Sequence, residues 1–235
     1  MRQIILDTET TGLDHRQGHR IIEVAGVEVI NRRLTHKHFH QYVNPDRDID
    51  EGAQAVHGIS REFLADKPRF ADISDAFLDF ITGAELVIHN APFDVGFLNA
   101  ELALLGKPPV TQFCDKVTDT LKMARDNYPG KRNSLDALCD RLDIDNSRRN
   151  LHGALLDAEL LAEVFLVMTR GQDGFAMVFE ESEQSIAFNA DASRLQQLKI
   201  MTASENELLE HQKVLEQIQK ESGGKCLWLS QTAQH

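Results

Sequence analysis

Hydrophobic positions along residues 1–170 follow two periods, and each period predicts one kind of secondary structure. Continuous or alternating apolar residues predict strands, which cover 3–6, 21–30, 33–43 and 86–89. Apolar residues spaced three and four apart predict helices, which cover 50–64, 72–82, 93–105, 117–127, 134–142 and 153–169. A hairpin at Asn31-Arg32, followed by strands interleaved with helices, predicts an α/β fold with a mixed sheet covered by helices.

The hydrophobic pattern weakens after residue 171. Polar and small residues predict a linker over 172–204, and the segment 205–235 contains one amphipathic helix, expected at 205–221. Neither the apolar stripe of this helix nor the triplet Leu227-Trp228-Leu229 has a core of its own, so we expect both to bind a partner protein. Packing back onto the first domain is the alternative. We therefore expect a globular domain at 1–171 and a flexible tail with a short helix.

Composition limits the classes of function. A net charge of −12 argues against a protein that grips duplex DNA mainly by neutralising phosphates, because that mode needs a basic face. Three widely spaced cysteines without a CxxC pair indicate neither a disulfide framework nor a zinc site. No apolar run is long enough to span a membrane, and the strand-like start leaves no room for a signal peptide, so we expect a cytoplasmic protein.

Two acids, Asp7 and Glu9, follow an apolar strand directly and lie two residues apart. This spacing places both side chains on the same side of the strand end. Two like charges held there repel each other unless a cation lies between them, and a divalent cation would fit. The alternative is a solvated turn whose threonines cap the acids, which for this pair alone is the better interpretation.

Two later segments supply further candidates. Asp94 falls in the first turn of the helix that follows strand 86–89, near the strand end where ligands bind in α/β sheets, although acids are common at any helix N-terminus. Asp157 shares the inward face of its helix with apolar residues, where a buried acid needs a partner such as a metal ion. His152 precedes this helix, and is either part of the site or an ordinary surface histidine.

In order and approximate spacing, segments 7–12, 90–94 and 152–157 resemble the three motifs of the DEDDh exonuclease superfamily. Each motif is weak alone, and together they are specific. Segments 21–24, 56–59, 113–138 and 226–228 also resemble the family of proofreading (epsilon) subunits of bacterial DNA polymerase III. The likeness is nearly continuous over 1–170 and patchy beyond it, and it implies an RNase H-like sheet.

This resemblance implies a 3′→5′ exonuclease that removes mispaired 3′-terminal nucleotides as 5′-monophosphates. Asp7, Glu9 and Asp157 would ligate two divalent cations, Mg²⁺ or Mn²⁺, and Asp94 would help to position the second ion. His152 would accept the proton of the attacking water.

The same resemblance implies contacts and partners. Thr10, Leu13 and His57 would contact the 3′ nucleotide. The polymerase (alpha) subunit would bind the C-terminal segment, and a small third core subunit is left open. Beyond the domain, a glutamine with apolar residues three and five positions later resembles a peptide that binds the beta sliding clamp, although an ordinary linker start is the alternative. The residues of this peptide are Gln172, Phe175 and Met177.

Two other functions fit parts of the pattern. A DEDDh exoribonuclease that trims RNA 3′ ends would have the same site, because the chemistry does not depend on the sugar. The appended tail favours a polymerase subunit over this alternative. A non-catalytic adaptor with the same fold would have no reason to keep an inward-facing Asp157.

Overall fold

The computed structural model of the chain describes residues 1–147, 149, 151–170, 203–223 and 228. The chain divides into two compact units, Met1–Glu180 and Glu181–His235, which are treated separately below. The predicted clamp-binding peptide and most of the predicted linker lie outside the described residues, as do Leu227 and Leu229.

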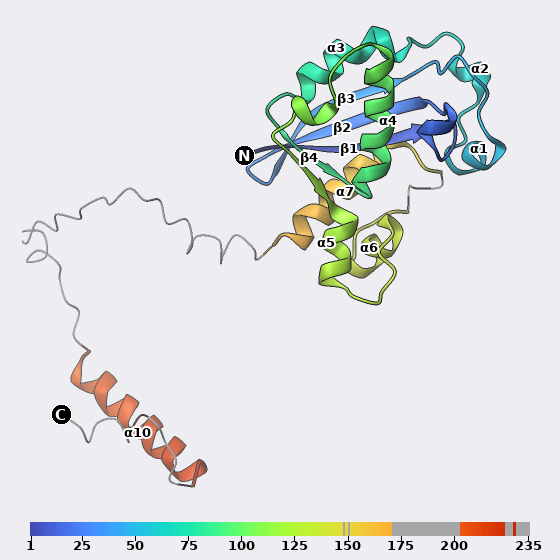
Figure 1. Cartoon of the computed structure of the whole chain (residues 1–235). Helices are drawn as coiled ribbons and strands as arrows, with labels where there is room; N and C mark the ends of the chain where they lie inside the picture. The colour runs from blue at the N-terminus through green and yellow to red at the C-terminus, as the bar shows by residue number, and fades with distance from the viewer. Residues whose placement is uncertain (148, 150, 171–202, 224–227, 229–235) are drawn as a thin grey trace, which may run out of the picture. The chain divides into compact units, whose positions relative to one another are not determined.

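A five-stranded sheet with the order β3-β2-β1-β4-β5 forms the centre of the first unit (Figure 1). Its strands are β1 (Arg2–Thr10), β2 (Ile21–Ile30), β3 (Arg33–Tyr42), β4 (Glu85–Ile88) and β5 (Lys116–Asp119). The first three strands are antiparallel, and β4 and β5 run parallel to β1. Asn31 and Arg32 both adopt positive φ, as a tight hairpin turn requires. The mixed RNase H-like sheet and the hairpin are thus confirmed.

Helices cover both faces of this sheet (Figure 1). The helices described in the first unit are α1 (Glu51–His57), α2 (Arg61–Leu64), α3 (Phe70–Ile81), α4 (Ala91–Leu104), α5 (Thr120–Asn127), α6 (Leu135–Leu142) and α7 (Ala154–Met168), with short 3₁₀ turns at His15–Gln17 and Val110–Gln112. One hydrophobic core packs α3 and α4 against one face, and a second packs α5, α6 and α7 against the other. The central strands are therefore apolar on both faces.

Successive residues of β1 point into opposite layers. Ile4 and Leu6 belong to the core under α3 and α4, whereas Ile5 belongs to the core under α7. By the same alternation, Asp7 and Glu9 continue the face of Ile5. The strand thus directs two carboxylates toward the layer that contains α7.

Three element predictions were wrong in detail. β1 continues to Thr10, so Asp7 and Glu9 lie inside the strand, because pairing with β2 extends through both residues. The first residues of the helix expected at 117–127 belong to β5, a strand too short to show a period in the sequence, and the helix itself begins at Thr120. Gly58, with a φ of 70°, ends α1 and divides the helix expected at 50–64.

In the second unit, α10 (Glu205–Glu221) confirms the predicted C-terminal helix. Ser204 and Glu207 form a capping box at its start. None of its residues is buried, and its larger apolar side chains are exposed: Leu208, Leu209, Val214 and Ile218. Trp228 is 70% exposed. Of the helices in the described ranges, none is both long and apolar enough to cross a membrane.

Candidate active site

The four acids expected from the sequence come from three elements and line one pocket of about 270 Å³, together with Asp136 of α6. β1 supplies Asp7 and Glu9, the first turn of α4 supplies Asp94, and the first turn of α7 supplies Asp157. His152, directly ahead of α7, lines the same pocket. The structure thus brings together all five residues expected to be catalytic.

The turn between β4 and α4 sets the position of Asp94. Asn90 caps α4 in the left-handed conformation, and its backbone N–H donates to Asp119 at the end of β5, over 3.2 Å. The Thr8 hydroxyl on β1 donates to Asp94 Oδ1 over 2.7 Å. Asp94 is therefore held by β1, the strand that also carries Asp7 and Glu9.

The start of α7 is held by a carboxylate of β2 that the sequence did not single out. Gly153 has no side chain with which to cap the helix, and the Ala154 N–H donates instead to Glu23 Oε2 over 3.1 Å. The other oxygen of Glu23 lies 2.7 Å from His40 Nε2 on β3. The His152 N–H donates to the Val56 carbonyl of α1 over 3.1 Å. These contacts fix both His152 and the first turn that carries Asp157.

Arg149 is a further site residue that sequence reasoning missed. Its Nε donates to Asp157 Oδ1 over 2.5 Å and its Nη2 to Asp157 Oδ2 over 2.7 Å. Its Nη1 donates to Asp136, and its Nη2 also lies 2.8 Å from His152 Nδ1. The side chains of Arg149 and Asp157 are only 5% and 4% exposed. The one signal in the sequence was a cation eight residues before an inward-facing acid.

Three of the acids hold their protons more tightly than usual. Burial, and then the charges of Asp94, Asp157 and Glu9, raise the pKa of Asp7 well above its ordinary value. Burial and the charge of Asp157 raise the pKa of Glu9 to about 8. Burial also raises the pKa of Asp94 to about 7, against the hydrogen bond from Thr8. Such crowding of carboxyl groups favours a bound cation.

Asp157 behaves in the opposite way. Burial alone would raise its pKa, but the hydrogen bonds from Arg149 and His152 outweigh burial, and the pKa lies below its ordinary value. Asp157 is therefore the acid of the cluster that stays ionised through its own cationic partner.

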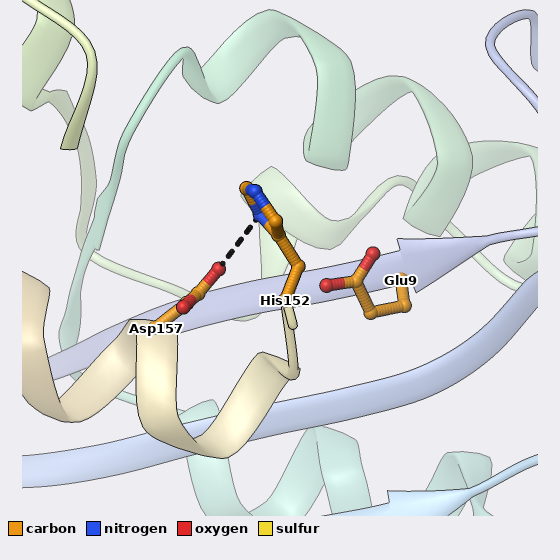
Figure 2. Close-up of side chains that lie close together, drawn as sticks. All are labelled: Glu9, His152 and Asp157. Carbon is orange, nitrogen blue, oxygen red and sulfur yellow. Dashed lines mark ion pairs between the residues drawn. The ribbon is translucent and has the colours of Figure 1, made fainter. Parts of the chain in front are cut away.

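The donor set suits a divalent metal ion. Glu9, His152 and Asp157 offer ligand atoms that lie within 4.8 Å of one another. Figure 2 shows Glu9 on the strand, and His152 and Asp157 at the start of α7 with the ion pair between them, Nδ1 to Oδ2 at 3.2 Å. Carboxylate oxygens are the ligands that Mg²⁺ and Mn²⁺ prefer. The residues present therefore fit such ions.

A second pocket, of about 500 Å³ and mainly apolar, adjoins the first. It contains all three residues expected to contact the 3′ nucleotide, namely Thr10, Leu13 and His57. Thr8, Glu9 and Phe93 line both pockets. A group held in the second pocket would thus lie beside the acids.

Comparisons with known proteins agree with this geometry. The family model described as "Exonuclease" (RNase_T) matches residues 4–165. The chain is 55% identical to DNA polymerase III subunit epsilon of Salmonella typhimurium and 53% identical to that of Escherichia coli, in each case over 97% of both chains. Among solved structures, Exonuclease X in complex with 5′ overhanging duplex DNA has a TM-score of 0.57 and 29% identity, over 74% of this chain and 93% of that one. The nuclease domain of 3′hExo, a DEDDh family member bound to rAMP, has a TM-score of 0.62 at 22% identity, over 74% and 92% of the two chains, and shows a shared fold.

Proposed function

This chain belongs to the exonuclease family and, within it, to the DNA polymerase III epsilon subunits, and from that premise we propose how its residues carry out the reaction. It is a proofreading 3′→5′ exonuclease subunit of DNA polymerase III. Relatives at 53–55% identity favour this function over an RNA-trimming exoribonuclease or a non-catalytic adaptor. The observation that carries the residue assignments is the meeting of the four acids expected from the sequence in one pocket.

In this proposal Asp7, Glu9 and Asp157 ligate two Mg²⁺ or Mn²⁺ ions directly, and Asp94 positions the second ion. The raised pKa values of Asp7, Glu9 and Asp94 support this role, since divalent charge would relieve the repulsion that holds their protons. When bound, the ions would stabilise the attacking and leaving oxygens of the phosphodiester displacement.

His152 is proposed to take the proton of the attacking water. Its side chain is 44% exposed at the pocket, so water reaches it. A guanidinium can only donate, so Arg149 and Asp157 compete for Nδ1, which accepts from Arg149 when it carries no proton and donates to Asp157 when it carries one. Proton transfer to Nε2 therefore requires Arg149 to release the ring, and Nδ1–H could then donate to Asp157.

The 3′-terminal nucleotide is proposed to occupy the apolar pocket of Thr10, Leu13 and His57. Leu13 is 85% exposed at this pocket, as a side chain that wedges against an unpaired base would be. Preference for DNA over RNA 3′ ends, measured with matched oligonucleotides, tests the substrate. Leu13→Ala should raise KM for a mispaired 3′ end, and an unchanged KM would remove Leu13 from this role.

We extend the proposal to the parts of the chain: an exonuclease domain at 1–171, a linker at 172–204 and a polymerase-binding segment at 205–235. The exposed apolar side chains of α10 and Trp228 support the last assignment. Deletion of residues 186–235 should abolish co-purification with the polymerase (alpha) subunit and leave hydrolysis of free single strands intact. Co-purification of the truncated chain would place this contact elsewhere.

The same proposal includes two further partners, the sliding clamp and a small third core subunit. It also includes a cytoplasmic location, which cell fractionation would check. The peptide with Gln172, Phe175 and Met177 is proposed to bind the beta sliding clamp. Gln172→Ala with Phe175→Ala should weaken clamp binding in a pull-down and leave nuclease activity unchanged. Co-purification from cells would show whether a small third core subunit binds.

The central experiment is hydrolysis of a 5′-labelled single-stranded oligonucleotide, with and without Mg²⁺. The expected result is stepwise shortening from the 3′ end, with release of nucleoside 5′-monophosphates, only when the metal is present. The variant Asp7→Ala serves as the control, because it should be inactive in both conditions. Shortening without metal would overturn the two-ion mechanism.

A further inference from the structure

A groove of about 540 Å³ adjoins the catalytic pocket beside α5 and the loop that precedes α6. It shares His89 and Ser134 with the catalytic pocket. Three cations line it: Arg125 in the last turn of α5, and Lys131 and Arg132 in the loop. This gathering of positive charge stands out in a chain whose net charge is −12.

The three cationic side chains are exposed and form no ion pair with any residue in the described part of the chain. Many other cations of the first unit do pair with acids, for example Arg20 with Glu101 and Lys107 with Asp75. Two acids of the neighbouring elements are engaged elsewhere. Asp119 caps α5 and binds the Asn90 N–H, and Asp136 accepts from Arg149. The groove therefore keeps positive charge available for a ligand.

The main chain of the loop is held in place while its cationic side chains stay free. Arg141 on α6 donates to the Arg132 carbonyl over 2.8 Å and to Asn133 Oδ1 over 3.1 Å. The same guanidinium stacks on the Tyr128 ring, 4.7 Å from its centre. Asn133 Nδ2 donates to the Tyr128 carbonyl over 3.3 Å. The arrangement is thus preorganised to present Lys131 and Arg132, which limits the entropy lost on binding.

The groove and the apolar pocket adjoin the catalytic pocket through different residues. The apolar pocket shares Thr8, Glu9 and Phe93 with the catalytic pocket, and the groove shares His89 and Ser134 with it. The groove is therefore within reach of a strand whose terminal nucleotide occupies the apolar pocket and whose last phosphodiester lies at the acids.

We propose that this groove binds the sugar–phosphate backbone of the strand on the 5′ side of the scissile bond, with Arg125, Lys131 and Arg132 contacting its phosphates. The inference rests on the proposed function. No Phe, Tyr or Trp among the described residues lines the groove, and its charged lining residues are all cations. It therefore holds the strand chiefly through phosphates, and phosphate contacts carry no sequence information. Such binding suits an enzyme that must accept any terminal sequence.

The test compares two substrates in the intact protein. A single-stranded oligonucleotide has phosphates that reach the groove, whereas a nucleoside 5′-phosphate nitrophenyl ester has none. The triple variant Arg125→Gln, Lys131→Gln, Arg132→Gln should raise KM for the oligonucleotide roughly tenfold, because exposed charge contacts each change affinity a few-fold. Its kcat, and its hydrolysis of the ester, should stay at the wild-type level.

Salt dependence gives a second, independent readout. Each phosphate contact removed should flatten the plot of log(kcat/KM) against log(salt) by about 0.7 for a single strand. The charge-retaining variant Arg125→Lys, Arg132→Lys should restore the slope. Lys37→Gln, on the exposed strand β3 at the other edge of the sheet, is the matched control and should change neither readout.

The outcomes are separable from failure of the proposed function. If the wild-type protein hydrolyses neither substrate, the proposed function fails first. If the triple variant keeps the wild-type KM and salt slope on the oligonucleotide, the groove does not bind the strand. Equal loss on both substrates would show that the substitutions act on the catalytic pocket, and would also overturn the assignment.

Discussion

Arg149 holds both carboxylate oxygens of Asp157, at 2.5 Å and 2.7 Å. The guanidinium thereby takes the place that a metal ion would occupy beside this acid. Oxygens bound in this way are not free to ligate a metal ion at full strength, so the ion pair and the metal compete for Asp157. The same guanidinium contacts His152 Nδ1, so the competition also reaches the proposed base.

The first prediction is that Arg149→Gln binds Mn²⁺ several-fold more tightly than wild type, because the competing cation is gone. Its metal-free form should lose about 3 kcal/mol or more of stability, since the buried carboxylate of Asp157 loses its guanidinium partner and keeps only the contact with His152. Calorimetric titration and thermal unfolding would measure the two effects. Arg69→Gln, which removes an exposed pair with Asp46, is the control. Weaker metal binding by Arg149→Gln would show that the arginine supports the ions.

The second prediction compares the four acids by the effect of each Ala replacement on nuclease activity and on metal-free stability. Replacement of Asp7, Glu9, Asp94 or Asp157 by Ala should each reduce nuclease activity more than about 100-fold, because the remaining ligands cannot hold both ions in register. From the sequence alone we expect level or higher metal-free stability in all four variants. The structure changes this expectation for Asp157→Ala, which should be destabilised because the buried Arg149 loses its bidentate carboxylate and keeps only Asp136 as an acidic partner. Thermal unfolding with a chelator checks the contrast, and a large loss for Asp7→Ala would mark Asp7 as a structural acid.

The third prediction concerns pH. The folded chain holds protons on Glu9 and Asp94 up to pKa values of about 8 and about 7, whereas the unfolded values lie near 4. Their contribution to stability is therefore full below pH ~4 and is lost as the pH rises through 7 to 8. The melting temperature of the metal-free protein should fall between pH 5 and about 8, and added Mn²⁺ should restore it most at the upper end.

A pH series of thermal unfolding, with chelator and with Mn²⁺, makes this measurement. The double variant Glu9→Gln, Asp94→Asn is the control, and its metal-free stability should vary less over the same window. A metal-free melting temperature that rises across the window would contradict the assigned proton binding.

The fourth prediction assigns proton transfer to His152. His152→Ala should lower kcat by about 10²–10⁴ and leave the Mn²⁺ affinity nearly unchanged, since the residue acts as a base and not as a ligand. Weakened Mn²⁺ binding would instead make His152 a ligand, which its place among the donor atoms allows.

Strong periodic signals account for what the sequence predicted. Long strands and helices show their period over many residues, so β2, α4, α7 and α10 were placed within two residues of their observed ends. β5 has only four residues, too few to show alternation. The four acids could be assigned to one site from the sequence because each lies at a recognisable place on a strand or helix. Arg149 lies in a loop, and only the folded path of that loop brings it to Asp157.

The contact between Glu23 and the first turn of α7 has a genetic consequence. Glu23 binds the Ala154 N–H and His40, and neither Glu23 nor His40 lines the catalytic pocket. Loss of the carboxylate would let the start of α7 shift, and Asp157 would shift with it. Glu23→Ala is therefore expected to behave as a mutator allele, raising the spontaneous mutation rate of a strain that carries it as its sole copy. Fluctuation assays would detect such an allele, at a residue that does not line the catalytic pocket.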